Sequence, residues 1–166
     1  MDEKRLYVLA IFDAETQRRL SSLYGALRER GFAGTQTEQI PYHFTMHACD
    51  LTQRARLCAL LDAVARDTAC VDFRFDHLGV FGTRVIIAEP NMNYEILDLE
   101  KRFCPECTSG DHFWTAHATL LMDEPENIMR ALPLAVELFE PFRARIEKLS
   151  LYEFFPSLLI KTVDLK

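Results

Sequence analysis

The apolar residues are spaced in some segments as in amphipathic helices and form short runs of strand length in others, which predicts a mixture of helices and strands. Residues 6–12 form a continuous apolar run of strand length. Residues 14–31 place leucines three and four positions apart, as in an amphipathic helix, and Gly31 is a suitable C-terminal stop. The same reasoning predicts helices over 53–69, 93–103 and 126–139, the last broken or kinked near Pro133, a loop over 104–112, and strands over 42–48, 71–80, 84–89, 117–122, 142–152 and 157–163.

The predicted elements occur twice in the same order. In each half, a strand with a histidine near its start is followed by a helix and then by two strands. The likeness is clearest between HLGVF at 77–81 and KLSLY at 148–152. No stretch rich in Pro, Gly or Ser separates the halves. We therefore expect one bilobal α+β domain over residues 1–166, with a pseudo-two-fold repeat and a shared core.

Composition narrows the class of protein. A chain of 166 residues that is 49% apolar can bury a sizeable core. The net charge of −6, with basic residues scattered, favours a nucleotide-sized ligand over a long nucleic acid. No apolar run approaches the length of a membrane span, and the N-terminus lacks a signal-peptide cleavage site. The five cysteines therefore predict reduced thiols in a cytoplasmic protein.

The most informative motif is His-x-Thr, which occurs at equivalent places in the two halves. Its copies are His43-Phe44-Thr45 and His117-Ala118-Thr119. Because side chains alternate along a strand, each histidine shares a face with its threonine, while the apolar residue between them points to the core. One such motif is weak evidence for a function. Two copies in register are much stronger, because a duplicated structural unit need not keep a histidine.

This combination suits phosphodiester cleavage without a metal or a cofactor. One imidazole can remove a proton from the attacking group while the other protonates the leaving oxygen, since histidine titrates near neutral pH. The threonine hydroxyls can donate hydrogen bonds to the phosphate oxygens, where charge develops. The sequence does not assign the acid and the base between His43 and His117.

The chain resembles the two-histidine phosphoesterase superfamily, in particular its bacterial 2′-5′ RNA ligase-like and cyclic phosphodiesterase branches. The likeness rests on IPYHFTMHACD, FDHLGVFGTRVIIAEP and FWTAHATLLM and covers nearly the whole chain. It implies antiparallel sheets with flanking helices around a central cleft. It also implies a phosphodiesterase that acts on a small nucleotide or short RNA end, at a 2′,3′-cyclic phosphate or a 2′-5′ linkage. Carried over by motif, it implicates His43, Thr45, His117 and Thr119.

Four aromatic residues are candidates for stacking on a base. Phe113 and Trp114 precede the second motif, and Phe81 and Tyr152 occupy matching places in the repeat. Ordinary core packing is the alternative for each of them. His47 should share the face of the first motif by alternation, but Leu121 matches it in the other half, so we interpret His47 as a rim or structural residue.

Two interpretations compete with catalysis. A nucleotide-binding module without turnover would keep the same cleft. A zinc-stabilised interaction domain could use Cys104, Cys107, His112 and His117, although this set lacks the tight Gly-rich loop of a zinc knuckle. The two cysteines could instead form a redox pair, but such a pair should open a helix after a strand, and this one follows a predicted helix.

Overall fold

The computed structural model describes residues 4–35, 40–104 and 114–166 and shows strands and helices mixed along the chain. The elements are β1 (Arg5–Phe12), α1 (Ala14–Glu29), β2 (His43–Asp50), a 3-10 turn (Leu51–Gln53), α2 (Arg54–Asp67), β3 (Val71–Phe81), β4 (Val85–Pro90), α3 (Tyr94–Lys101), β5 (Ala118–Met122), α4 (Pro125–Leu138), β6 (Phe142–Phe154) and β7 (Leu158–Asp164). Every predicted helix and strand is present, and the ends differ only slightly from those expected.

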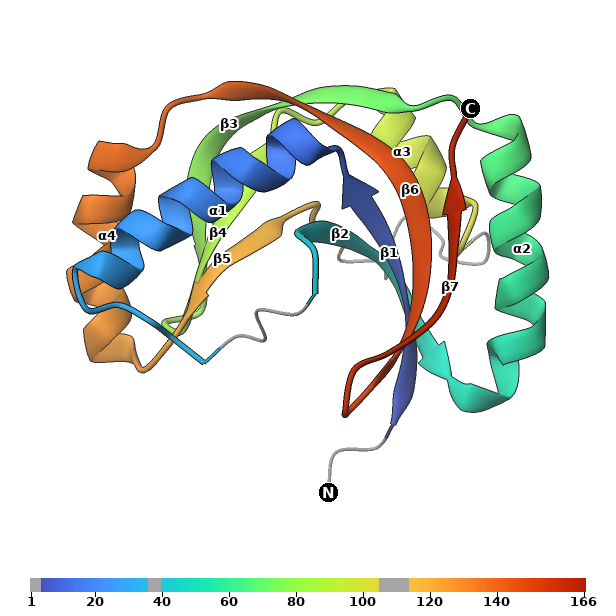
Figure 1. Ribbon diagram of the computed structural model, residues 1–166, viewed down its shortest axis with the longest axis horizontal. Helices are drawn as coiled ribbons and strands as arrows, with labels where there is room; N and C mark the ends of the chain where they lie inside the picture. The colour runs from blue at the N-terminus through green and yellow to red at the C-terminus, as the bar shows by residue number, and fades with distance from the viewer. Residues whose placement is uncertain (1–3, 36–39, 105–113) are drawn as a thin grey trace.

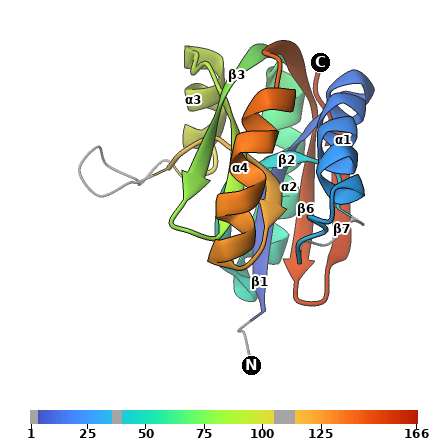
Figure 2. The ribbon, with the colours of Figure 1, turned by 90° about the vertical axis from the view of Figure 1, so that its left-hand side faces the viewer.

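One seven-stranded sheet joins the two halves, and every pairing in it is antiparallel. The strand order is β2-β1-β6-β3-β4-β5, with β7 paired to β6. The sheet curves so that its edge strands β2 and β5 contact each other, with α1 and α4 at one side and α2 and α3 at the other (Figures 1 and 2). This confirms the α+β fold and brings the two motif strands together.

The structural lobes do not follow the repeat in the chain. The motif strand β5 pairs with β4, which belongs to the preceding hairpin, but the motif strand β2 pairs with β1 at the start of the chain. The strand β6 takes part in both lobes, since it pairs with β3 through its first part and with β1 and β7 through the rest. The halves therefore share one sheet rather than packing as two separate units.

Local sequence explains how two helices end or continue. Gly31 takes a positive φ of 90°, and the N–H of Phe32 donates to the carbonyl of Leu27, which closes α1 with a Schellman motif. The helix was expected to be broken or kinked near Pro133, and the break is wrong, because α4 runs through this residue to Leu138. Pro133 lies on the exposed side of the helix, where its ring does not disturb the core.

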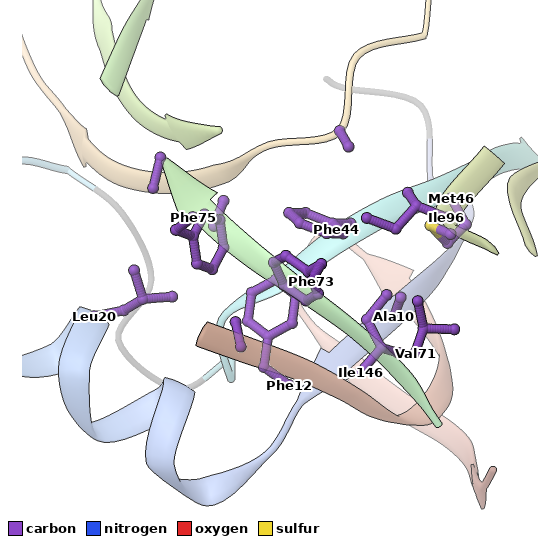
Figure 3. Close-up of a cluster of buried hydrophobic side chains, with 14 of the residues drawn as sticks. Ala10, Phe12, Leu20, Phe44, Met46, Val71, Phe73, Phe75, Ile96 and Ile146 are labelled. Atoms are coloured by element: carbon purple, nitrogen blue, oxygen red, sulfur yellow. The ribbon is translucent and has the colours of Figure 1, made fainter. Parts of the chain in front are cut away.

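Phenylalanine rings fill the centre of the core. Phe12 of β1, Phe44 of the motif strand β2, and Phe73 and Phe75 of β3 pack with ring centroids 4.8 to 5.8 Å apart (Figure 3). Most pairs meet edge to face, the arrangement that aromatic quadrupoles favour. Phe44 is completely buried, so the middle residue of the first motif is fixed in the core.

A second, smaller apolar cluster marks the opposite face of the sheet. It contains Leu9, Ile11, Tyr152 and Phe154, whereas the alternate residues of β1 belong to the main core. We call the face that carries Leu9 and Ile11 the cleft face. Among the described residues, no helix is both long and apolar enough to cross a membrane.

Candidate active site

The strand β2 places His43 and Thr45 on the cleft face. His43 pairs with Ile11 and Thr45 pairs with Leu9, and residues that pair directly across strands point to the same side. Both motif side chains are partly exposed, whereas Phe44 between them is buried. The alternation expected from the sequence is thus present.

The second motif has the same arrangement at the other edge of the sheet. Ala118 is buried in the main core and pairs with Ala88, while Thr119 pairs with Ile87, which lies outside the main core. His117 and Thr119 are partly exposed. Both copies therefore turn a histidine and a threonine away from the core.

Each motif strand has a bulge directly after its threonine. The pairing skips Met46 in β2 and Leu120 in β5. His47 consequently pairs with Val8, a main-core residue, so it lies on the face opposite to Thr45. The prediction that His47 shares the face of the first motif is wrong, whereas its interpretation as a structural histidine agrees with this register.

The two imidazoles are held in the same way. Nδ1 of His43 lies 2.7 Å from the carbonyl oxygen of Pro41, and Nδ1 of His117 lies 2.7 Å from that of Thr115. A carbonyl oxygen only accepts, so each Nδ1 must carry the proton. In the neutral ring this leaves Nε2 as the basic atom, and in the charged ring Nε2–H is a donor. The geometry therefore prepares each histidine for proton transfer through Nε2.

A glutamine of α1 fixes the segment before the first motif. Nε2 of Gln17 donates to the carbonyl of Tyr42 at 2.8 Å, and the N–H of Tyr42 donates to Oε1 of Gln17 at 2.8 Å. These paired bonds hold Tyr42 between Pro41 and His43. The carbonyl that orients His43 is thereby tied to the helix.

A tryptophan links the two motifs directly. Nε1 of Trp114 donates to the carbonyl of Thr45 at 2.8 Å, and the ring packs partly buried against the main core. Trp114 is adjacent to Thr115, whose carbonyl holds His117. One side chain thus joins the backbone of the first motif to the segment that orients the second histidine.

The two histidines also interact electrostatically. Burial, the largest effect, lowers the pKa of His43 below its ordinary value, and a positive charge on His117 lowers it further. The hydrogen bond to Pro41 opposes this shift without reversing it. His43 therefore favours its neutral form, which is the form that can accept a proton.

A cavity of about 440 Å³ opens beside the motifs. It adjoins His43 from the first copy and Thr119 from the second, so both copies reach one space. Its remaining lining comes from α1, the segment before β2, β5 and the end of β6: Ser21, Tyr24, Arg28, Ile40, Pro41, Tyr42, Met122, Phe154 and Phe155. The size falls within the range of small-molecule sites.

The predicted stacking residues lie in different settings. The ring of Phe81 is exposed at 39% and meets the ring of His117 edge to face, with centroids 4.5 Å apart. Tyr152 is buried and stacks on Phe154 at 5.8 Å, and burial raises the pKa of Tyr152. Trp114 packs as described above, and Phe113 lies outside the described residues. A stacking role for these rings stays a prediction.

The structure gives no support to the zinc site. Within the described part of the chain, no group of three or more His, Cys, Asp and Glu side chains is arranged to hold a metal ion. Cys107 and His112 lie outside that part. Cys104 is disulfide-bonded and so offers no thiolate to zinc, whereas Cys49 and two further cysteines are free thiols. The prediction of a reduced thiol is therefore wrong for Cys104.

Several site residues could not be found from the motifs. Gln17 holds Tyr42, and the carbonyls of Pro41 and Thr115 orient the two histidines, but no sequence pattern predicts these hydrogen bonds. Arg28 and Phe155 reach the cavity from α1 and from the turn after β6, far in sequence from both motifs. The position of Trp114 just before the second motif did indicate a site residue, but it suggested stacking on a base and not the hydrogen bond to the carbonyl of Thr45.

Comparison with known proteins agrees with this geometry. The model of the 2′-5′ RNA ligase superfamily matches residues 14–154. Among solved structures, E. coli LigT complexed with NADP+ is 15% identical with a TM-score of 0.67 and 99% of each chain covered, and TT0787 of Thermus thermophilus is 16% identical with a TM-score of 0.68 and 97% of each chain covered. These likenesses show a shared fold, and no curated protein matches the chain. The family match covers most of the sequence and confirms the predicted resemblance: the chain belongs to the 2′-5′ RNA ligase superfamily.

Proposed function

We propose that the chain is a metal-independent phosphodiesterase that cleaves a small ribonucleotide diester, either a 2′,3′-cyclic phosphate or a 2′-5′ linkage. Membership of the superfamily supports a phosphoesterase. The observation that carries the specific proposal is the matched pair of imidazoles, each with Nδ1 bound to a carbonyl two residues earlier and Nε2 left for chemistry. The LigT structures of similar fold hold NADP+, 3′-AMP or ATP, which supports a nucleotide ligand.

We assign the general base to His43 and the general acid to His117. The lowered pKa of His43 favours the neutral ring, whose Nε2 accepts a proton from water as the water oxygen bonds to phosphorus. The bond from phosphorus to the leaving ribose oxygen then breaks, and Nε2–H of charged His117 supplies the proton to that oxygen. One proton is taken up and one is given, so the pair resets when His43 returns its proton to water and His117 takes one up.

The threonines complete the phosphate site. Thr45 and Thr119 lie two residues after their histidines on the cleft-facing side of each strand. Their hydroxyls can donate to non-bridging oxygens on either side of one phosphate, where negative charge increases in the transition state. Their part is therefore to hold the phosphate, while proton transfer belongs to the histidines.

A turnover assay with a chelator present tests the proposal. The purified chain should cleave adenosine 2′,3′-cyclic phosphate or 2′-5′-linked ApA at an unchanged rate after exhaustive chelation, because both catalytic groups are imidazoles. Product would be measured by chromatography before and after chelation. Loss of activity that returns with zinc or magnesium would contradict the mechanism. Nucleotide binding with no turnover of either substrate would favour the inactive binding module.

The pH dependence of kcat/KM should report the environment of His43. Because burial and the charge of His117 lower its pKa, the acid limb should have its midpoint below about 6.5, the ordinary histidine value. Activity is retained while pH falls toward that midpoint and is lost below it, as the base becomes protonated. Circular dichroism at each pH controls for unfolding. A midpoint clearly above the ordinary value would contradict the assignment of His43 as a neutral base.

Replacing Trp114 with Phe should lower kcat more than it changes KM. The variant keeps most of the ring but removes the N–H that holds the carbonyl of Thr45, so the two motifs lose a direct link. Misplacement on the scale of an ångström can cost up to about 100-fold in rate, and we expect a loss of about 10-fold or more.

Thr68→Val is a matched control for this variant. Its hydroxyl, at the C-terminal end of α2, donates to the carbonyl of Val64 at 2.7 Å and accepts from Arg102 at 2.6 Å, and Thr68 does not line the cavity. Denaturant unfolding would compare the loss of stability in the two variants, and kcat and KM would be measured for both. If Trp114→Phe keeps the kcat of Thr68→Val, the tryptophan has a packing role only.

A further inference from the structure

We propose that Phe81 is a positioning residue for the second motif, and that its ring holds the imidazole of His117 in the orientation that proton transfer needs. This inference rests on the proposed function, since it concerns one of the two histidines assigned there. The rings of Phe81 and His117 meet edge to face, with centroids 4.5 Å apart and an interplanar angle of 81°. Aromatic rings favour this arrangement, so the contact is both attractive and directional.

The backbone holds His117 less firmly than it holds His43. His43 is the first residue of β2 and takes part in the ladder with β1. His117 precedes β5, whose ladder with β4 begins only at Ala118. The hydrogen bond between Nδ1 and the carbonyl of Thr115 restrains one edge of the imidazole. The contact with Phe81 restrains another part of the ring, so the two together fix its plane and the direction of Nε2.

The turn of the β3–β4 hairpin fixes Phe81 in its place. Phe81 and Val85 form the last pair of the hairpin, and the N–H of Arg84 donates to the carbonyl of Phe81 at 3.3 Å. Gly82 takes a positive φ of 54°, which glycine adopts without strain. The carbonyl of Arg84 accepts from the N–H of Asp123 at 3.0 Å, which ties the turn to the residue after β5. The backbone of Phe81 is therefore fixed relative to the strand of the second motif.

Phe81 points to the same side of the sheet as the second motif. Ile86 belongs to the main core, so Val85 and Ile87 on either side of it point to the other face. Phe81 pairs with Val85 and Thr119 pairs with Ile87, and residues that pair directly across strands point to the same side. The register of the sheet thus brings the ring to the face on which the second histidine acts.

The repeat gives only one of the two histidines an aromatic neighbour from this position. Tyr152, which occupies the matching place, is buried and stacks on Phe154 with centroids 5.8 Å apart. Phe81 instead turns its ring to a motif histidine and is still 39% exposed. Stacking on the base of a substrate is the alternative use of such a ring, so the test must separate it from the positioning of His117.

Kinetics with and without a base on the substrate make this separation. Phe81→Leu should lower kcat about 10-fold with little change in KM, because a misdirected Nε2 slows proton transfer and leaves phosphate binding in place. The loss should be equal for adenosine 2′,3′-cyclic phosphate and for a ribose 2′,3′-cyclic phosphate that carries a methoxy group in place of the base. Phe81→Tyr, which keeps the ring, should retain most of kcat.

Val80→Ala is the matched control and should retain kcat. Val80 lies in the same strand and is exposed to a similar extent, but it pairs with Ile86 of the main core and so points to the other face. An equal loss in this variant would mean that damage to the hairpin, rather than the ring of Phe81, lowers the rate. A loss in Phe81→Leu that appears only with the base-bearing substrate would show stacking. Either result would overturn the inference.

Spectroscopy tests the inference apart from catalysis. Long-range proton–nitrogen NMR spectra, recorded with the imidazoles neutral, report which ring nitrogen carries the proton. His117 should hold the proton on Nδ1 in the unmodified chain and in Val80→Ala, and should show a mixture of both tautomers in Phe81→Leu. This result supports the positioning role even if neither diester is cleaved, an outcome that would reject the proposed function alone. A tautomer that Phe81→Leu leaves unchanged would overturn the positioning role and leave the phosphodiesterase proposal intact.

Discussion

The burial of one apolar side chain in each motif is the constraint on which the site depends. Phe44 is enclosed by the phenylalanine cluster and Ala118 packs into the same core, and neither position is accessible to water. Since side chains alternate along a strand, burying these residues turns the flanking histidine and threonine to the other face. A one-residue slip would bury polar groups and expose the core, so the packing energy of the sheet also fixes the direction of the catalytic side chains.

The topology then converts two equivalent strands into one site. β2 and β5 end the path of a curved sheet and contact each other, so His43 of the first motif and Thr119 of the second line one cavity although they lie in different halves of the chain. Carbonyls two residues before each histidine set its tautomer, and Gln17 and Trp114 hold those segments in place. Core packing therefore positions the motif strands, and the backbone carbonyls then orient the two imidazoles so that each Nε2 is left for proton transfer.

Sequence reasoning was most successful where burial decides the structure. Every helix and strand followed from apolar periodicity, and the faces of both motifs followed from alternation. It failed where a local irregularity or a distant partner intervenes. The bulge at Met46 moves His47 to the other face, the exposure of Pro133 lets α4 continue, and the hydrogen bond of Trp114 depends on where the sheet edges meet. The cavity could not be predicted either, because residues such as Arg28 come to line it only when the chain folds.

A double-mutant cycle of the two histidines tests the central claim most directly. His43→Ala and His117→Ala should each lower kcat/KM by about 10²–10⁴-fold, the usual size of general acid–base catalysis. The double variant should lose far less than the product of these factors, because the two groups serve one transition state. His47→Ala, in the same strand but on the other face, should keep most of the activity. Folded variants that retain near-normal turnover, or single losses that simply multiply, would contradict a cooperating acid–base pair.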